Sequence, residues 1–449
     1  MHRLRSLCVV LACVAGLLGG APLLAQPAPV LDLQAAWAAA RAQDPAFLAA
    51  LAAWRAGVEP QVQARAALLP NVSFTSSYNQ VELQQQSGGL TTPYSYATNN
   101  NALVARQPLW RAGQTVQYEQ SVLQSQAAQV QAELAEVDLA QRLGAAYFDL
   151  LFSQDVIRFT DALVVASQGQ LQAARRSFEA GQGTRTDIDE AQARLDMANA
   201  QMLQARQQST YARQQLEAMV GRAVQDLAPL AQDALQAQPL EVNVEGWIAL
   251  AAQHSLELRL AQLRLSVAEQ EVARARAGHQ PTVDLVGQYT MSNGENMYSP
   301  SSGYHSAQLG VQLSLALYAG GAVNSAVRQA LALQEREQQL LLQTRASLQL
   351  QVRRAYYDST EGVARVQALE QALQSAQQLL LSSRKGVQAG SRTQTDVLNA
   401  LQRQAEAQRD LAQARYQLVL ARQRLRTLCG VAPAQAIGTT QSQLGPAPG

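Results

Sequence analysis

Charged and hydroxyl side chains gather in two short, glycine-containing segments of the sequence. Residues 180–190 (AGQGTRTDIDE) include Thr186 and Asp187, and residues 389–397 (AGSRTQTDV) include Arg392 and Asp396. Carboxylates in such a cluster are suited to acid–base chemistry, to attracting cations or to closing an opening through ion pairs. Each cluster also opens a predicted helix, where threonine caps free N–H groups and the helix dipole favours carboxylates. We therefore interpret both clusters as helix starts. Where these segments of several copies of the chain meet, their opposite charges would also form a latch that holds the opening between them shut.

The rest of the sequence offers no catalytic constellation. His254, His279 and His305 lack metal-ligand spacing, and there is neither a glycine-rich phosphate loop after a predicted strand nor a GxSxG motif. After removal of a signal peptide, Cys429 is the one remaining thiol, which gives an exported chain no disulfide framework. We expect no catalytic residue, no metal site and no cofactor.

The two clusters belong to a duplication within the chain. Thr393 follows Thr184 by 209 positions, and the same offset relates Gly430 to Gly221. Solenoid units are far shorter, usually ~20–50 residues. The offset therefore predicts two domain-sized blocks, so that each chain has an approximate internal two-fold relation.

Composition and the N-terminus narrow the class of protein. The charged fraction of 15% is low, and the net charge of +1 comes without a basic or acidic run, so nucleic acid is not an expected partner. Arg3 and Arg5 precede an apolar stretch at 7–18 that is too short to span a bilayer, which predicts a secretory signal peptide cleaved after Ala25. The segment Leu11-Ala12-Cys13 faintly resembles a lipoprotein processing site, so lipidation of Cys13 remains an alternative to its removal with the signal peptide. No other apolar stretch is long enough for a transmembrane helix.

Proline placement marks two helical regions, since no proline occurs between Pro108 and Pro229 or between Pro300 and Pro433. A continuous helix over residues 111–180 would be about 105 Å long at ~1.5 Å per residue. Glycines then end it, and a return helix follows with a heptad stripe in which large residues often alternate with alanine, at 188–219 and again at 397–428. Sustained three–four spacing in both blocks indicates coiled-coil packing rather than a helix on a globular core.

Each block also contains two segments with strand character. Residues 71–86 and 97–107 form the first pair, joined by a turn at 87–96, and residues 282–291 and 306–317 form the second. At 307–317 apolar residues alternate with small or polar ones, as in a membrane β-barrel strand, and a tilted strand of ~9–11 residues crosses a bilayer. Two ordinary hairpins in a soluble domain are the alternative.

The predicted fold class is mostly α-helical with a small membrane β-barrel contribution. The expected segments are a signal peptide (1–25), a first repeat (26–221), a linker (222–242), a second repeat (243–430) and a flexible tail (431–449). The first repeat should contain a helix at 32–68, a hairpin at 71–107, a long helix at 111–180 and a return helix at 186–220. The second should contain a helix, a hairpin at 282–317, a long helix at 320–388 and a return helix at 393–428. Four strands cannot close a barrel, and open sheet edges are not tolerated in lipid. Two chains would give a filled eight-stranded barrel, whereas three would give twelve strands and a lumen. Such a barrel on a tube of helices is a conduit.

Four motifs occur in an informative order and spacing. They are WRAG at 110–113, AGHQPTVDL at 277–285, LYAGG at 317–321, and GSRT followed by DVL at 390–398. In these motifs, and over nearly the whole mature chain, the sequence resembles the TolC family of outer-membrane export ducts. The resemblance implies a homotrimer with a 12-stranded barrel in outer-membrane lipid and an α-helical tunnel in the periplasm of a Gram-negative bacterium. It also implies docking to an inner-membrane transporter through a periplasmic adaptor, and export of drugs or proteins without chemistry.

The resemblance also implies roles for residues at the two turns. Arg392 would bond to Thr186 and Asp187 and so hold the periplasmic entrance closed. Asp396 would form a cation-attracting ring just inside that entrance. Linker 222–242 and the tail would belong to an equatorial region.

Two positions depart from the family pattern. Asn399 stands where a second ring aspartate is expected, and Val387 stands where some members have a tyrosine that helps them stay shut. We therefore expect a weaker cation block and a looser latch than in better-known relatives.

The expected function is that of an exit duct for a tripartite efflux pump or a type I secretion system. The motif at 277–285 favours the secretion branch. A periplasmic coiled-coil adaptor is the alternative, although adaptors have one helical hairpin and more β-structure. A diffusion porin would need many more strands per chain, and an enzyme fits least.

Overall fold

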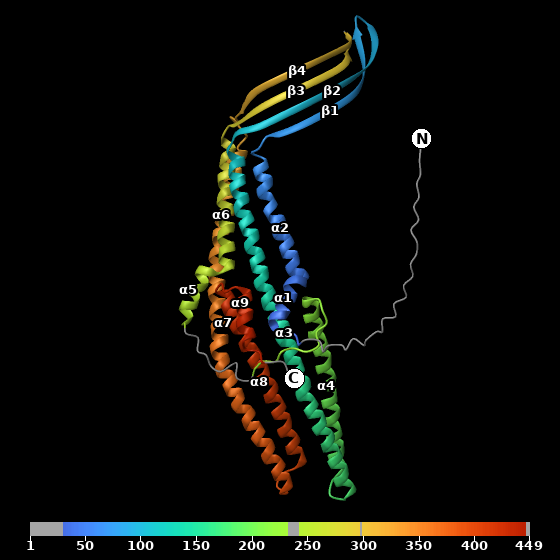
Figure 1. The fold of residues 1–449 in the computed structure, drawn as a ribbon, viewed down its shortest axis with the longest axis vertical. Coiled ribbons are helices and arrows are strands. Elements are labelled where there is room, and N and C mark those ends of the chain that lie inside the picture. Colours follow the sequence, from blue (N-terminus) through green and yellow to red (C-terminus); the bar gives the residue numbers. More distant parts are fainter. Residues whose placement is uncertain (1–29, 232–241, 297–298, 446–449) are drawn as a thin grey trace, which may run out of the picture.

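The computed structural model describes residues 30–231, 242–296 and 299–445. The predicted signal peptide, about half of the predicted linker and the last four residues lie outside these ranges. The chain forms one slender body, with a four-stranded sheet at one end and the turns of two helical hairpins at the other (Figure 1).

Two very long helices run along most of this body. α3 (Ala112–Glu179) has 68 residues and turns back into α4 (Arg185–Val220), while α7 (Ala322–Gln388) has 67 residues and turns back into α8 (Gln394–Leu428). At ~1.5 Å per residue each long helix is about 100 Å long. The predicted stripe lies on the buried face of both return helices, where the buried members are Ala191, Ala198, Met202, Ala205, Ser209, Ala212 and Leu216 in α4, and Ala400, Leu411, Ala414, Leu418 and Leu425 in α8.

The first repeat begins with two helices, which corrects the single helix predicted at 32–68. α1 (Leu33–Gln43) ends at Asp44, and α2 (Pro45–Ala66) begins at the next residue. Asp44 is extended because a following proline excludes the helical conformation, and its Oδ1 accepts the Phe47 N–H at 2.8 Å. The second repeat has a similar break between α5 (Val244–His254) and α6 (Leu256–Arg276), followed by the single-turn η1 (Ala277–His279).

The sheet is antiparallel with the order β1-β2-β3-β4. Its strands are longer than predicted: β1 (Asn71–Ser87), β2 (Leu90–Arg111), β3 (Thr282–Asn296) and β4 (Ser299–Ser314). Gly88 and Gly89, with φ of 63° and 83°, make a two-residue turn, so most of the segment predicted as a turn at 87–96 continues the ladder. β4 ends at Ser314, so the predicted strand end at 315–317 was wrong. The β2–β3 ladder joins the two repeats.

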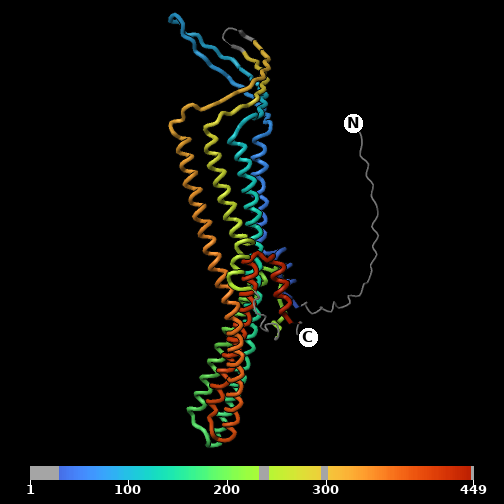
Figure 2. The backbone as a smooth tube through the Cα atoms, turned by 90° about the vertical axis from the view of Figure 1, so that its left-hand side faces the viewer, coloured from blue at the N-terminus to red at the C-terminus, as the bar shows by residue number. Residues whose placement is uncertain are grey.

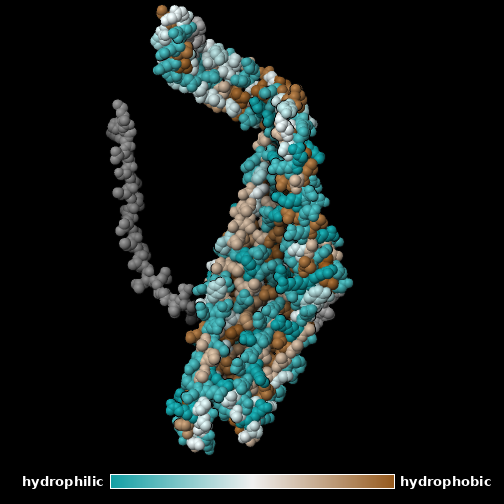
Figure 3. Space-filling view, turned by 180° about the vertical axis from the view of Figure 1, so that it is seen from behind, coloured by the Kyte–Doolittle hydropathy of each residue, from teal (hydrophilic) through white to brown (hydrophobic). Residues whose placement is uncertain are grey.

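One face of the sheet is apolar over its part nearest the helices. Phe74, Leu103 and Tyr289 face one another across three strands, and Leu309, Val311 and Leu313 alternate along the edge strand β4 with side chains 65–78% exposed. The opposite face is more polar, with Gln288 and Gln308 paired in register. Apolar colouring appears in the sheet and along the helical body in Figure 3, on a surface that is otherwise largely hydrophilic. Every helix in the described ranges is either too short or too polar to cross a membrane.

The C-terminal segment contradicts the predicted flexible tail. Residues Pro433–Gln441 form helix α9, whose Ala436 and Ile437 are fully buried, and Ile437 belongs to the main hydrophobic cluster with residues of α1, α3 and α8. The Gln441 Oε1 accepts the Leu33 N–H at 3.0 Å and so caps α1. Small residues made this segment look like a tail, but tertiary packing gives it a fixed place.

Candidate functional site

The two hairpin turns lie together at the end of the molecule farthest from the sheet (Figure 2). Gly181 and Gly390 both have φ of 72°, the left-handed conformation that glycine adopts at the C-terminal end of a helix. In the first turn the Gln182 N–H donates to the Ser177 carbonyl at 2.9 Å, and in the second the Ser391 N–H donates to the Gly386 carbonyl at 2.8 Å. The duplicated sequence therefore folds into the same turn twice.

Each turn ends in a capping box, which confirms the predicted helix starts. The Asp187 N–H donates to Thr184 Oγ1 at 3.2 Å, and the Thr184 N–H donates to Asp187 Oδ2 at 2.8 Å. Thr393 and Asp396 repeat this exchange at 3.3 and 2.9 Å. Hydrogen bonds from the threonine N–H and hydroxyl lower the pKa of both carboxyl groups. Both aspartates are therefore ionised at neutral pH.

Arg392 is bound on its own hairpin. Its Nη1 donates to Ser383 Oγ at 2.8 Å, and its methylene groups cover Gly386, where an added Cβ would lie 2.9 Å from Arg392 Cγ. Its positive charge also contributes to the lowered pKa of Asp396. Among the described residues of this single chain, no hydrogen bond or ion pair joins Arg392 to Thr186 or Asp187. The latch predicted for these three residues stays a prediction.

A different arginine joins the two hairpins near the turns. Arg194 Nη1 on α4 donates to Asn399 Oδ1 on α8 at 2.8 Å, and its Nη2 pairs with Glu190 Oε1 at 2.8 Å. Helical i,i+4 spacing could have indicated the pair with Glu190. The contact with Asn399 was missed, because nothing in the sequence sets how α4 and α8 lie against each other. A cavity of about 210 Å³ lies beside this link, between the hairpins.

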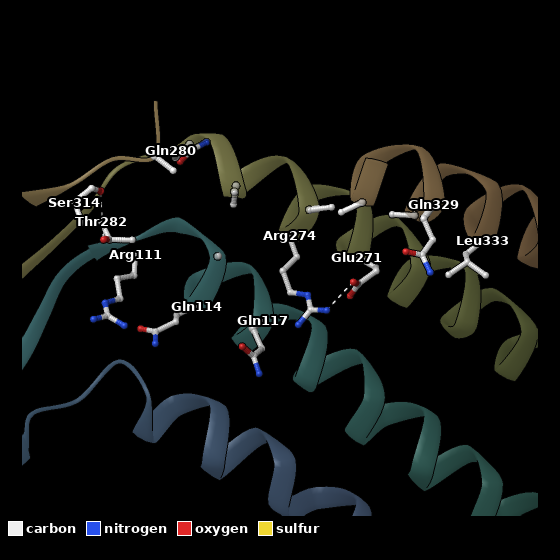
Figure 4. A pocket seen from close by; sticks show the side chains of 17 residues that line it. Arg111, Gln114, Gln117, Glu271, Arg274, Gln280, Thr282, Ser314, Gln329 and Leu333 are labelled. Atoms are coloured by element: carbon white, nitrogen blue, oxygen red, sulfur yellow. Dashed lines mark hydrogen bonds and ion pairs between the residues drawn. The ribbon is translucent and has the colours of Figure 1, made fainter. Parts of the chain in front are cut away.

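A second polar region lies where the helices meet the sheet. Figure 4 shows Arg111, Gln114 and Gln117 of the β2–α3 junction and Glu271 and Arg274 of α6 among the residues that line a cavity of about 660 Å³. The Arg274–Glu271 ion pair measures 2.6 Å.

An ion pair between a half-buried arginine and a buried aspartate links two strands at the same junction. Arg111 binds Asp284 through two hydrogen bonds of 2.7 and 2.5 Å, beside a register shift between Pro108 and Trp110. This pair was not predicted from the sequence, because it depends on the register between β2 and β3.

Neither region has the groups of a catalytic centre. No cluster of three or more histidine, cysteine, aspartate or glutamate residues suited to a metal occurs in the described part of the chain. At the turns Asp187 and Asp396 cap helices, and at the junction Glu271 and Asp284 are paired with arginine. The arrangement can attract or exclude ions and can link helices to each other.

A sheet with one apolar face, continued by helical hairpins about 100 Å long, is the architecture of an outer-membrane channel. The crystal structure of the outer-membrane protein VceC from Vibrio cholerae has this fold, with a TM-score of 0.73 and 19% identity over 89% of this chain and 96% of that chain. The chain belongs to the outer membrane efflux protein family, whose model matches residues 37–222 and 247–431. Both predicted repeats are thus members of one family.

Two curated relatives agree with this assignment. The proteases secretion protein PrtF of Dickeya chrysanthemi is 32% identical over 435 residues, which cover 95% of this chain and 93% of the relative. The outer membrane protein TolC of Vibrio cholerae is 29% identical over 90% of both chains. The chain is therefore an outer-membrane channel protein of the class that serves efflux and type I secretion, and it extends into the periplasm. The predicted TolC family is confirmed, and the adaptor alternative is not supported.

Proposed function

We propose that three copies of the chain form one continuous exit duct that serves a type I secretion system. The sheets join into a 12-stranded barrel in outer-membrane lipid, and the hairpins form the wall of a periplasmic tunnel. The duct is passive and acts without a catalytic residue, metal or cofactor. It receives its cargo from an inner-membrane transporter through a periplasmic adaptor.

The observation that carries this proposal is the open sheet with an apolar face. Within the described ranges β1 pairs with β2 and β4 pairs with β3, so each edge strand has one unpaired side. Lipid provides no hydrogen-bond partner for these backbone groups, so a membrane sheet must close on itself. Two copies would give eight strands with an interior filled by side chains, whereas three give twelve strands around a lumen.

The cargo we propose is a protein. PrtF, which matches 95% of this chain, is a proteases secretion protein. The AGHQPTVDL motif at the start of β3 favours the same branch of the family. Export of small molecules by a tripartite pump is the alternative, and it would use the same duct.

The entrance we propose lies at the hairpin turns. Arg392 has a neutral partner, Ser383, in the single chain, so it is able to exchange this bond for Thr186 and Asp187 of a neighbouring copy. Charge-assisted hydrogen bonds are stronger than neutral ones, which favours the closed state. The three copies of Asp396 then form an acidic ring at the axis.

Single-channel conductance in planar bilayers tests this proposal. The wild-type protein is compared with Arg392→Ser and with Arg384→Ser, a control that removes the same charge from an exposed position on α7. We expect a small, cation-selective conductance that rises in Arg392→Ser alone. An unchanged conductance in Arg392→Ser would eliminate the latch and keep the duct. No channel from folded, exported protein would overturn the duct itself.

A further inference from the structure

The polar face of the sheet contains an exposed arginine, Arg106 of β2. Arg106 lies two positions after Val104, which is paired with Gln288 of β3. Residues two apart on a strand, and residues paired across two strands, point to the same side of a sheet. Arg106 therefore lies on the side of Gln288, opposite the apolar face. Its side chain makes no hydrogen bond and no ion pair with the described residues.

A cavity of about 370 Å³ lies beside this arginine, between the end of α2 and the first two strands. The polar side chains among its lining residues are Asn71, Ser73, Arg106, Arg111 and Gln114, and none of the described residues that line it is acidic. Asn71 is paired with Arg106 across β1 and β2, so their side chains stand next to each other. The cavity therefore offers amide, hydroxyl and guanidinium donors without a competing carboxylate.

The second arginine of the cavity is already neutralised, whereas the first is not. Arg111 gives two hydrogen bonds to Asp284, and Figure 4 shows its side chain next to that of Gln114 at the start of α3. The side chains of Asn71 and Ser73 make no hydrogen bond within the described part of the chain. Arg106 thus adds a positive charge that no described carboxylate pairs with, beside two neutral groups whose donors are available.

We propose that Arg106, with Asn71 and Ser73, forms a site for anionic oxygens on the inner wall of the barrel, which carboxylates of an exported acidic polypeptide occupy in transit. This inference rests on the proposed duct and names the cargo chemistry that its outer-membrane segment accepts. Because the apolar face of the sheet contacts lipid, the polar face lines the lumen. The planar guanidinium group of arginine matches the two oxygens of a carboxylate.

Three copies of the chain place three such sites at one level, near the end of the barrel that joins the helices. Walls of low dielectric constant concentrate the field of these like charges in the lumen and so raise the local concentration of anions. Each site is open to water, so a single contact is weak and a carboxylate is released again. The duct then attracts cations at its Asp396 entrance and anions in its barrel.

Thiol-reaction rates on the full chain test the charge at this site. In a Cys429→Ser background, Ser73→Cys is a reporter inside the cavity, and the protein is reconstituted into vesicles of uncharged phosphatidylcholine. Its reaction rates with an anionic and a cationic methanethiosulfonate reagent are compared as a ratio. We expect this ratio to fall about three- to tenfold in Arg106→Gln and to be kept in Arg106→Lys. The difference should shrink at about 1 M salt, where the Debye length is about 3 Å.

Two further reporters control the position of the site. Ser77→Cys lies on the same face of β1 four positions away, about 13 Å at ~3.3 Å per residue. This distance exceeds the Debye length of about 10 Å at ~0.1 M salt, so Arg106→Gln should change its ratio little. Val72→Cys on the apolar face should react with neither reagent in the vesicles. A reactive Val72→Cys together with an unreactive Ser73→Cys would overturn the assignment of the inner face.

Protection of Ser73→Cys from the uncharged reagent N-ethylmaleimide identifies the ligand. Hexaglutamate should slow this reaction, hexaglutamine should not, and Arg106→Gln should abolish the protection. Inorganic sulfate that protects as well as hexaglutamate at the same total charge would show a site for small free anions and overturn the assignment to cargo.

The outcomes separate this inference from the proposed duct. A conducting trimer in which the reporter ratio is the same with Arg106 and with Arg106→Gln would overturn the site and keep the duct. A chain that is monomeric by light scattering and forms no channel would overturn the duct and, with it, the assignment to cargo, whatever the reporter shows.

Discussion

The Tyr416 hydroxyl on α8 donates a hydrogen bond to Asp155 Oδ2 on α3 at 2.7 Å and thereby joins the second repeat to the first. Asp155 also pairs with Arg158 of α3, so this carboxylate of the first repeat has one partner in each repeat. Burial, together with the charge of Asp155, raises the pKa of Tyr416, which remains a donor at any physiological pH.

Replacing Tyr416 by phenylalanine should destabilise the contact between the repeats. The change keeps the ring that lies against Phe148 but removes the donor to a carboxylate, a bond that contributes about 1.5–3 kcal/mol. The measurement is the thermal unfolding midpoint of detergent-solubilised protein by circular dichroism. Tyr318→Phe, at a side chain 88% exposed, is the control and should leave the midpoint unchanged. Equal midpoints for both variants would show that this bond contributes nothing net.

Removal of Arg111 should weaken the junction of sheet and helices. The Asp284 side chain is 7% exposed, so Arg111→Met leaves a buried carboxylate without its partner, at a cost of about 3–5 kcal/mol. The double variant Arg111→Met, Asp284→Leu removes the unpaired charge and should recover most of the loss. Yield of folded protein in the outer membrane and resistance to denaturation in detergent are the readouts. A double variant no better than the single one would contradict the role given to the pair.

The turn at 389–397 should loosen in acid. The folded-state pKa of Asp396 is lowered, so its capping contribution is complete above the ordinary aspartate pKa of about 3.9 and is lost as pH falls through the lower folded value. Hydrogen exchange of this turn, corrected for the intrinsic effect of pH, should be constant from about pH 7 to 5 and faster in stronger acid. In Asp396→Asn the exchange should be faster at pH 7 and should lack the acid transition. Mid-helix amides of α7 serve as the internal control.

Asn399→Asp should make the entrance more cation-selective. The substitution adds a carboxylate to each copy and converts the acceptor of the Arg194 bond into a charged one at the same 2.8 Å position. We expect the reversal potential to shift toward the equilibrium potential of the cation, and the open conductance to be lower with divalent cations. Asn399→Ala, which loses the acceptor without adding charge, should shift selectivity little. A shift of the same size in both variants would show that the added charge is not responsible.

Local sequence rules predicted those parts of the fold that depend on short-range signals. Absence of proline indicated the long helices, and glycine followed by threonine and aspartate indicated the turns at 181 and 390 with their capping boxes. The break at Asp44-Pro45 was also readable, since aspartate before proline is a helix-start signal, and it was missed. What could not be predicted depends on contacts distant in sequence.

In the candidate site, too, the contacts between residues close in sequence were predicted and those between distant residues were not. Asp187 and Asp396 were placed correctly at the helix starts, because their partners lie three residues away. The bond from Arg194 to Asn399 spans 205 positions and follows from how the hairpins pack, which no local pattern sets. Contacts between copies lie beyond a single chain altogether.

The cap that Gln441 places on α1 has a consequence for the order in which the chain can mature. The Leu33 N–H at the start of α1, the first helix of the described residues, donates to a side-chain oxygen 408 positions later, on the last helix of the described chain. A contact this distant forms after nearly all of the polypeptide has been made and exported. A chain cut short before α9 therefore lacks both this cap on α1 and the contribution of Ile437 to the main hydrophobic cluster.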